Sequence, residues 1–416
     1  MKFCALITPT LTLPRRGGGK KRALNRMRIL AFRPDGLVIP YIHASMVRAF
    51  RTLGIEVLEL PFPQHEENLQ TLKSFTSQGP AAVFSLDLPL QSALNNILRD
   101  IQEDLQIPWI IWFVDDPEGY GFPECCDPAR TMVFCWDREI TNQISLRDSW
   151  RGIPPIHLPL ASDPGVFYPQ ESGRPLLFPG GVFVGSTAHP NPMLDKAIQN
   201  SPGFFNDISN LWEAWRGDLG RFPQRLAWDY LEKRTGKEKE TLCHDLLARL
   251  WVHAAVYALG IRKRKELVSR IIGEGGGVFG DRGWHEITGD LYRGEAAYGD
   301  DLRRLYNASG FVLDIRQPQA RTGLTQRIFD ASACGRPVLA EFSPEIESLF
   351  DSEKEVLAFH TLEEAQEAKE TMLRNPRKVI EKSSRARGKV LALHTYRHRA
   401  AQIIKTLQRF FPAPLA

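Results

Sequence analysis

The sequence predicts an α/β protein made of two Rossmann-like domains that face a central cleft, with a helical insertion in the second domain. Three observations support this fold class. Short apolar, β-branched runs alternate with helical stretches from Met27 onward, a Pro-rich connector interrupts them near residues 156–169, and the alternation then resumes. Continuous apolar strands of this kind are typical of parallel sheets that are buried on both faces.

Length and composition limit the classes of protein to consider. The chain has 416 residues, which suits two domains, and no run approaches the ~18 apolar residues of a membrane span. The formal charge of +4 depends on the first 26 residues, since seven of the 53 basic residues and no acidic residue precede Met27. The remaining chain has 46 basic and 49 acidic residues, which argues against a nucleic-acid partner.

Residues 1–26 combine Pro, Gly and Arg without periodicity, and we expect a disordered leader or a mis-called start there. Positive charge follows the apolar stretch of this segment, whereas it would precede it in a signal peptide. The six cysteines show no zinc spacing. The sequence therefore predicts a cytoplasmic protein with reduced thiols and no transmembrane segment, and peripheral contact with a membrane is compatible with it.

The first domain is predicted over residues 27–165. A helix that ends before Gly54 separates its first two strands, because glycine often follows a helix in the left-handed conformation. The expected strands are 27–32, 55–60, 81–87, 109–116 and 132–137.

The second domain is predicted over residues 166–388, with a helical insertion at about 190–272. Residues 389–416 have apolar positions compatible with a one-faced helix, which we expect to pack on the body. The expected strands of this domain are 181–186, 277–281, 311–316, 336–341 and 356–359.

Two such domains place their ligand in the cleft at the carboxyl ends of the strands. No G-x-G-x-x-G follows the first strand and no P-loop occurs, which disfavours an oxidoreductase, a methyltransferase or an NTPase. The segment Arg321 to Gly335, RTGLTQRIFDASACG, instead predicts a helix over Gln326–Cys334 with Thr325 as its N-cap.

Backbone amides at the turn around Gly323 and at this helix start can bind an anion such as a pyrophosphate. The guanidinium groups of Arg316, Arg321 and Arg327 can add phosphate contacts. An ordinary capped helix beside a solvated loop is the alternative interpretation of the same residues.

Several segments, taken in order, resemble CgeB-type (spore-maturation-like) glycosyltransferases of the GT-B superfamily. They are IPWIIWFVDDP, FCWDREITN, HLPLASDPGVFYP, FVGS, RTGLTQRIFDASACGRPVLAE, IESLFDSEKEVLAFHTLEEA and HTYRHR. The resemblance covers nearly the whole chain from Met27 and implies a GT-B fold. It also implies sugar transfer from a nucleotide-diphosphate donor to a hydroxyl of a cell-surface, spore-coat, protein or polysaccharide glycan, without cofactor or metal. By the same resemblance, residues 27–165 form the acceptor-side domain and residues 166–388 the sugar-nucleotide-binding domain.

The retaining enzymes of this superfamily carry two acids eight positions apart before their donor-binding helix. Laid on this sequence, the pattern puts Thr322 at the first acid and Asp330 at the second, and so implies a ribose contact for Asp330. The missing first acid leaves a second hypothesis open, namely a non-catalytic sugar-nucleotide-binding or assembly protein with the same fold.

The resemblance also points to two loops of the second domain. Gly185 and Ser186 match the loop that faces the donor phosphates. After the strand at 277–281, Arg282 can meet a phosphate and Trp284 can stack on a base, although a core position for Trp284 fits equally well.

The acceptor side carries weaker signals. Asp115 and Asp116 end one strand and His43 follows another, so each can face the cleft as an acceptor contact or a general base. Each is equally compatible with a helix cap or a solvated loop. No metal-ligand spacing occurs near these strands, as in folds that neutralise the leaving group with protein dipoles.

Overall fold

The computed structural model describes most of the chain from Met27 onward. The expectation for residues 1–26 lies outside the described residues. The described ranges are 27–62, 74–75, 81–88, 102–103, 106–117, 126–148, 150–170, 175–187, 192–317 and 319–412.

The first domain contains a parallel six-stranded sheet with the order β2-β1-β3-β4-β5-β6. The five predicted strands are present, and a two-residue strand from the connector, β6, adds an edge. The apolar runs of β1, β3, β4 and β5 are buried, as expected for strands covered on both faces, whereas the edge strands β2 and β6 are mostly half-buried. The strands are β1 (Arg28–Arg33), β2 (Glu56–Pro61), β3 (Ala81–Leu86), β4 (Trp109–Phe113), β5 (Thr131–Cys135) and β6 (Ile156–His157).

Two helices of this domain frame the edge of the sheet that faces the second domain. Helix α2 (Ile39–Thr52) packs on β1 and β2 and ends before Gly54, which has the predicted left-handed backbone with φ of 84°. Helix α5 (Arg138–Ser145) follows β5 directly, and the Asp137 side chain caps it by accepting from the amides of Glu139 and Ile140.

The second domain contains a parallel five-stranded sheet with the order β11-β10-β9-β7-β8. Alternate residues of its central strands face two different cores, as the period of two requires. Val312 and Val338 join the core that extends to the first domain, whereas Leu313 and Leu339 join the core of the insertion. The strands are β7 (Val182–Val184), β8 (Gly277–Phe279), β9 (Val312–Asp314), β10 (Val338–Glu341) and β11 (Leu357–Phe359).

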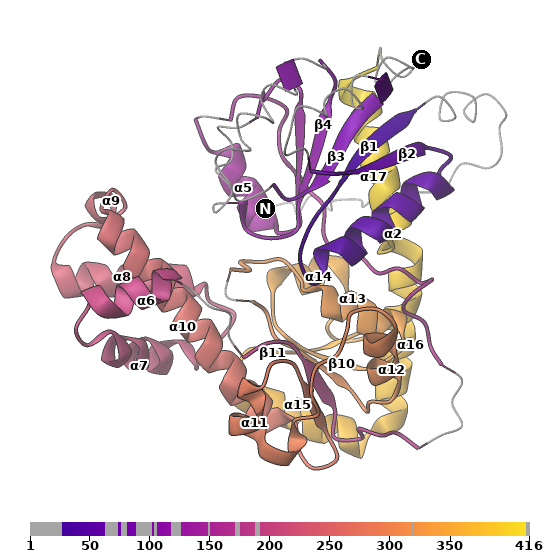
Figure 1. Ribbon diagram of the computed structural model, residues 1–416. Helices are drawn as coiled ribbons and strands as arrows, with labels where there is room; N and C mark the ends of the chain where they lie inside the picture. Colours follow the sequence, from indigo (N-terminus) through magenta and orange to yellow (C-terminus); the bar gives the residue numbers. More distant parts are fainter. Residues whose placement is uncertain are drawn as a thin grey trace, which may run out of the picture.

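The predicted insertion is a helical subdomain between β7 and β8 that projects from the side of the second domain (Figure 1). Its last helix is the longest, and it returns the chain to the sheet while packing on the other insertion helices. The helices are α6 (Pro192–Asn200), α7 (Phe204–Trp215), α8 (Pro223–Thr235), α9 (Lys239–Leu242) and α10 (Leu246–Ile271).

The rest of the chain surrounds the second sheet and then returns to the first domain. Within the described ranges, no helix is long and apolar enough to cross a membrane. The elements are α11 (Gly283–Thr288), the 3-10 helix η2 (Gly289–Leu291), α12 (Asp300–Asn307), α13 (Gln326–Ala333), α14 (Pro344–Leu349), α15 (Leu362–Arg374), α16 (Pro376–Leu393) and α17 (Tyr396–Phe410).

The single helix expected over residues 389–416 is wrong in one respect, because the chain breaks at His394 and Thr395 between α16 and α17. Helix α17 then packs on α2 of the first domain, behind the first sheet in Figure 1. At this break Thr395 pairs with Ser162 of the connector. The two passages of the chain between the domains therefore lie side by side.

Candidate active site

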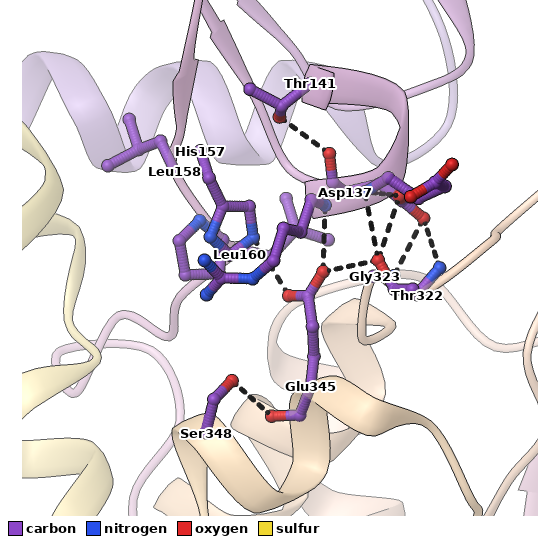
Figure 2. Close-up of polar contacts among 12 residues, drawn as sticks. Asp137, Thr141, His157, Leu158, Leu160, Thr322, Gly323, Glu345 and Ser348 are labelled. Carbon is purple, nitrogen blue, oxygen red and sulfur yellow. Dashed lines mark hydrogen bonds and ion pairs between the residues drawn. The ribbon is translucent and has the colours of Figure 1, made fainter. Parts of the chain in front are cut away.

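One carboxylate of the first domain binds three backbone amides of the loop after β9. Asp137 Oδ2 accepts hydrogen bonds from the backbone N–H groups of Arg321, Thr322 and Gly323, at 2.8, 2.7 and 2.7 Å (Figure 2). The amides predicted to bind an external anion thus already hold a carboxylate of the other domain. Anion binding at these three groups requires displacement of Asp137.

A second buried carboxylate extends this interdomain contact. Glu345 Oε1 accepts from the Thr322 hydroxyl and from the Arg138 amide, both at 2.8 Å, and its other oxygen lies 2.9 Å from His157 Nε2 of β6 (Figure 2). Thr322, which stands where the family pattern has an acid, therefore lies between two acids, Asp137 and Glu345. Its hydroxyl serves to connect the domains.

Gly323 is required by close packing. A Cβ atom at this position would lie 2.5 Å from ring atoms of Trp136, a distance that side chains do not tolerate. Only glycine lets the loop approach the first domain closely enough for its amide to reach Asp137.

The helix predicted after the loop is confirmed. Helix α13 starts after Thr325, whose side chain caps the Arg327 amide, and Gly335 follows its end with φ of 68°. Asp330 on this helix is fully buried, and its carboxylate accepts from Ser162, Tyr298 and Gln326. Burial raises the pKa of Asp330 to about 7, against the lowering effect of these hydrogen bonds. The expected ribose contact would have to replace one of these partners.

The loops after β7 and β8 lie against each other at the carboxyl edge of the second sheet. A Cβ atom on Gly280 would lie 2.1 Å from the Gly185 carbonyl oxygen. Asp281 accepts from both the amide and the hydroxyl of Thr187 at 2.6 Å, which joins the two loops. In the sequence, Ser186 stands between Gly185 and Thr187, which make these two contacts, and it is the residue predicted to face the donor phosphates.

Two predictions for the second loop have different outcomes. Trp284 is fully buried and donates its indole N–H to the Gly185 carbonyl at 2.7 Å, so stacking on a base is corrected to a core role. Its ring packs edge-on against Phe183, which keeps it in the insertion core. Arg282 is exposed, and its phosphate contact stays a prediction.

Two guanidinium groups flank the loop after β7. Arg327 donates to Asp314 at 2.6 Å and to the Val184 carbonyl at 2.7 Å. Arg264, from α10 of the insertion, donates to the Ser186 carbonyl at 2.7 Å. Burial, followed by the charge of Arg327, lowers the pKa of Arg264 to about 10. The two cations are therefore close enough to repel each other and are only partly buried, as an anion site requires.

The remaining predicted arginines are occupied by protein groups. Arg316 is buried and donates to Glu341, to the Leu219 carbonyl and to the Arg321 carbonyl, so its predicted phosphate contact is corrected to a structural role. Lys263 of α10 donates to the same Glu341 carboxylate at 2.8 Å. The Arg321 guanidinium lies 3.7 Å from Asp116 of the first domain.

The three residues predicted for the acceptor side lie in two different places. Asp115 Oδ1 accepts from Gln319 of the second domain at 3.1 Å, and Asp116 lies near Arg321, so both aspartates face the second domain. His43 is buried on α2, 3.9 Å from a Glu59 oxygen, and burial lowers its pKa. Within the described chain, no hydrogen bond or ion pair joins His43 to the two aspartates, so a shared catalytic role with them has no geometric support.

Four polar side chains of the candidate active site were not predicted from the sequence. Asp137 and Glu345 looked like ordinary helix-start acids, and their partners are distant in sequence. Arg264 belongs to a basic run of the insertion with no motif around it. Asp87 ends the run AAVFSLD, and its backbone φ of 51° was the signal that only the structure reveals.

Metal ions in proteins are bound by groups of side chains that lie close together. Among the described residues, no group of three or more His, Cys, Asp or Glu side chains is arranged to hold a metal ion. Cationic side chains lie instead at the carboxyl edge of the second sheet, where the leaving group of a transfer reaction would need charge neutralisation.

The fold is similar to that of solved glycosyltransferases. An α-glucosyltransferase in complex with UDP matches at 10% identity and a TM-score of 0.53, over 92% of this chain and 99% of that one. HepE from Anabaena, in complex with UDP and glucose, matches at 12% identity and a TM-score of 0.49, over 92% of this chain and 100% of that one. Sucrose-phosphate synthase from Thermosynechococcus elongatus matches at 12% identity and a TM-score of 0.49, over 93% of this chain and 100% of that one.

The sequence itself matches a family model described as glycosyl transferase-like over residues 252–405. No curated protein matches the chain. The matched region begins within α10 and includes α13, β10 and most of α17. The predicted two-domain GT-B fold is confirmed, and the family match supports the predicted glycosyltransferase class. The CgeB-type subfamily stays a prediction.

Proposed function

We propose that this protein transfers a sugar from a nucleotide-diphosphate donor to a hydroxyl of an acceptor. The second domain holds the donor and the first domain presents the acceptor. The observation that carries this proposal is the pair of guanidinium groups, Arg264 and Arg327, on either side of the loop after β7. They lie at the carboxyl edge of the sheet, where ligands of such folds bind.

The charges around this loop favour an anionic ligand. Asp314 neutralises Arg327, but the hydrogen-bond partner of the Arg264 side chain is a neutral carbonyl oxygen, and Lys263 and Arg316 share one carboxylate, Glu341. A diphosphate that binds here would relieve the repulsion between the two guanidinium groups. It would also accept charge-assisted hydrogen bonds, which are stronger than those to a carbonyl.

Calorimetry with UDP-, GDP-, ADP- and TDP-glucose tests the donor site. The wild-type chain should bind one of them, and Arg264→Ala and Arg327→Ala should each weaken binding about 10- to 100-fold, since a hydrogen bond to a charged group contributes about 1.5–3 kcal/mol. Arg262→Ala is the matched control, because Arg262 pairs with Glu266 on the same helix. Unchanged affinity in both test variants would refute the site.

The second hypothesis, a sugar-nucleotide-binding protein without turnover, is favoured by one observation. Thr322 replaces the first acid of the family pattern, and its hydroxyl is engaged by Asp137 and Glu345. Release of free sugar from the bound donor separates the hypotheses: slow hydrolysis by the wild-type chain and not by Arg327→Ala supports an enzyme. Tight binding without release of sugar supports the binding protein.

Finer assignments belong to the same proposal. The resemblance favours the CgeB-type subfamily, a glycan acceptor, action without a metal and a cytoplasmic location. Donor hydrolysis that persists in excess EDTA would support metal independence, and loss of hydrolysis that Mg²⁺ restores would contradict it.

A further inference from the structure

Asp87 stands at the end of β3, at the edge of the first sheet that faces the second domain. Its backbone has φ of 51°, in the left-handed region that side chains other than glycine rarely adopt. A single residue held in such a conformation costs of order 1 kcal/mol or more, and strain of this kind concentrates at functional sites. The strain aims the carboxylate toward the end of β4.

The two oxygens of this carboxylate have different surroundings. Oδ1 accepts from the amides of Val114 and Asp115, at 2.8 and 3.3 Å. Oδ2 is buried and has no hydrogen-bond partner among the described residues. A buried oxygen without a donor costs free energy unless a ligand supplies one.

The electrostatic surroundings favour uptake of a proton. Burial, followed by the negative charge of Asp115, raises the pKa of Asp87 to about 7. From the second domain, Gln319 donates to Asp115, and Arg321 lies 3.7 Å from Asp116. Asp87 therefore lies beside Asp115, whose side chain contacts the segment that precedes α13.

We propose that Asp87 is the general base that accepts the proton of the acceptor hydroxyl. This inference rests on the proposed glycosyl transfer. As the acceptor oxygen forms its bond to the anomeric carbon, its proton passes to Asp87 Oδ2. The bond from the anomeric carbon to the diphosphate oxygen breaks, and the nucleoside diphosphate leaves with the electron pair.

Asp87 suits this role better than the aspartates predicted from the sequence. Asp115 Oδ1 accepts from Gln319 and from the Asp116 amide, so this oxygen is occupied by protein donors. A base must have an oxygen free for the hydroxyl, which Asp87 Oδ2 provides, and a pKa close to the working pH.

The test uses hydrolysis of the donor selected by calorimetry, with water as the acceptor. In the wild-type chain, kcat/KM should rise with pH and level off above about pH 7. Asp87→Asn should lower kcat about 100- to 10,000-fold and remove this rise, as expected for loss of a general base, while the donor Kd stays unchanged. Asp87→Glu should restore part of the rate with a shifted profile.

Asp127→Asn is the control, because Asp127 lies at the opposite edge of the sheet, before β5, and is partly exposed. A structural role alone would lower the unfolding temperature of Asp87→Asn and leave its pH profile like that of the wild type, which would overturn the proposal. No turnover by the wild-type chain with any of the four donors would overturn this inference and the proposed enzyme together. Wild-type turnover with unaffected Asp87→Asn would overturn this inference alone.

Discussion

Asp137 of the first domain accepts a 2.7 Å hydrogen bond from the backbone N–H of Gly323 in the second domain. The same oxygen accepts from the two preceding amides, so one buried carboxylate holds three donors of the loop. The segment that resembles a donor-binding motif is therefore part of the contact between the domains. A ligand that binds to these amides would therefore have to displace the interdomain contact.

Substitution of Asp137 by Asn tests this contact. Asparagine still caps α5, but its amide cannot accept from all three backbone donors. We expect a loss of about 3 kcal/mol of stability, since each hydrogen bond to a charged group contributes about 1.5–3 kcal/mol and part is retained. Thermal unfolding measures the loss, and small-angle scattering should show a larger radius of gyration. Asp245→Asn is the control, because Asp245 is the N-cap of α10 and lies outside the interface; this variant should change neither the stability nor the radius of gyration strongly.

Substitution of Gly323 by Ala tests the close approach to Trp136. The added Cβ would meet the ring at 2.5 Å, so the loop must move away and lose its bonds to Asp137. We expect lower stability and weaker donor binding in calorimetry. Gly388→Ala is the control, because it lies in α16 with open space around it and alanine favours helices. Equal behaviour of the two variants would contradict the packing argument.

Substitution of Glu341 by Gln tests the buried charges at the end of β10. Lys263 and Arg316 would lose their shared carboxylate, and breaking a buried ion pair costs about 3–5 kcal/mol. We expect a large fall in unfolding temperature. The companion variant Lys263→Met leaves Glu341 paired with Arg316 and should destabilise less. A smaller effect of Glu341→Gln than of Lys263→Met would contradict the account.

Asp330 predicts a pH dependence of stability. Burial raises its pKa from the ordinary aspartate value of about 3.9 to about 7 in the folded protein, so between these values the folded state binds more protons than the unfolded state. Its contribution to the free energy of unfolding therefore falls as pH rises from about 4 to 7, by at most about 1.4 kcal/mol per pH unit. Denaturant unfolding of Asp330→Asn should show a smaller fall over this range than the wild type. Identical slopes would refute the raised pKa.

The strands were predictable from the sequence because burial on both faces demands continuous apolar runs, as in WIIWF of β4. The two ends of α13 were predictable because the residues that mark them, the N-cap Thr325 and the left-handed Gly335, are adjacent to the helix in the sequence. Strand β6 was not, since two residues inside a Pro-rich connector carry no periodicity.

The interface contacts could not be predicted for a different reason. Asp137 and Gly323 are 186 positions apart, and nothing in either local pattern names the other. Trp284 shows the same limit, because an aromatic residue after a strand fits a core and a ligand stack equally well. Side chains whose partners are distant in the sequence are thus the ones that the sequence left ambiguous.

The packing of α17 on α2 has a consequence for biosynthesis. The ribosome releases the strands of the first domain long before it has made the helix that covers α2. At about 5–20 residues per second, the delay between the connector and α17 is on the order of ten to fifty seconds. During that time an apolar face of the nascent first domain lacks its cover, and this is the period in which chaperones would have most to bind.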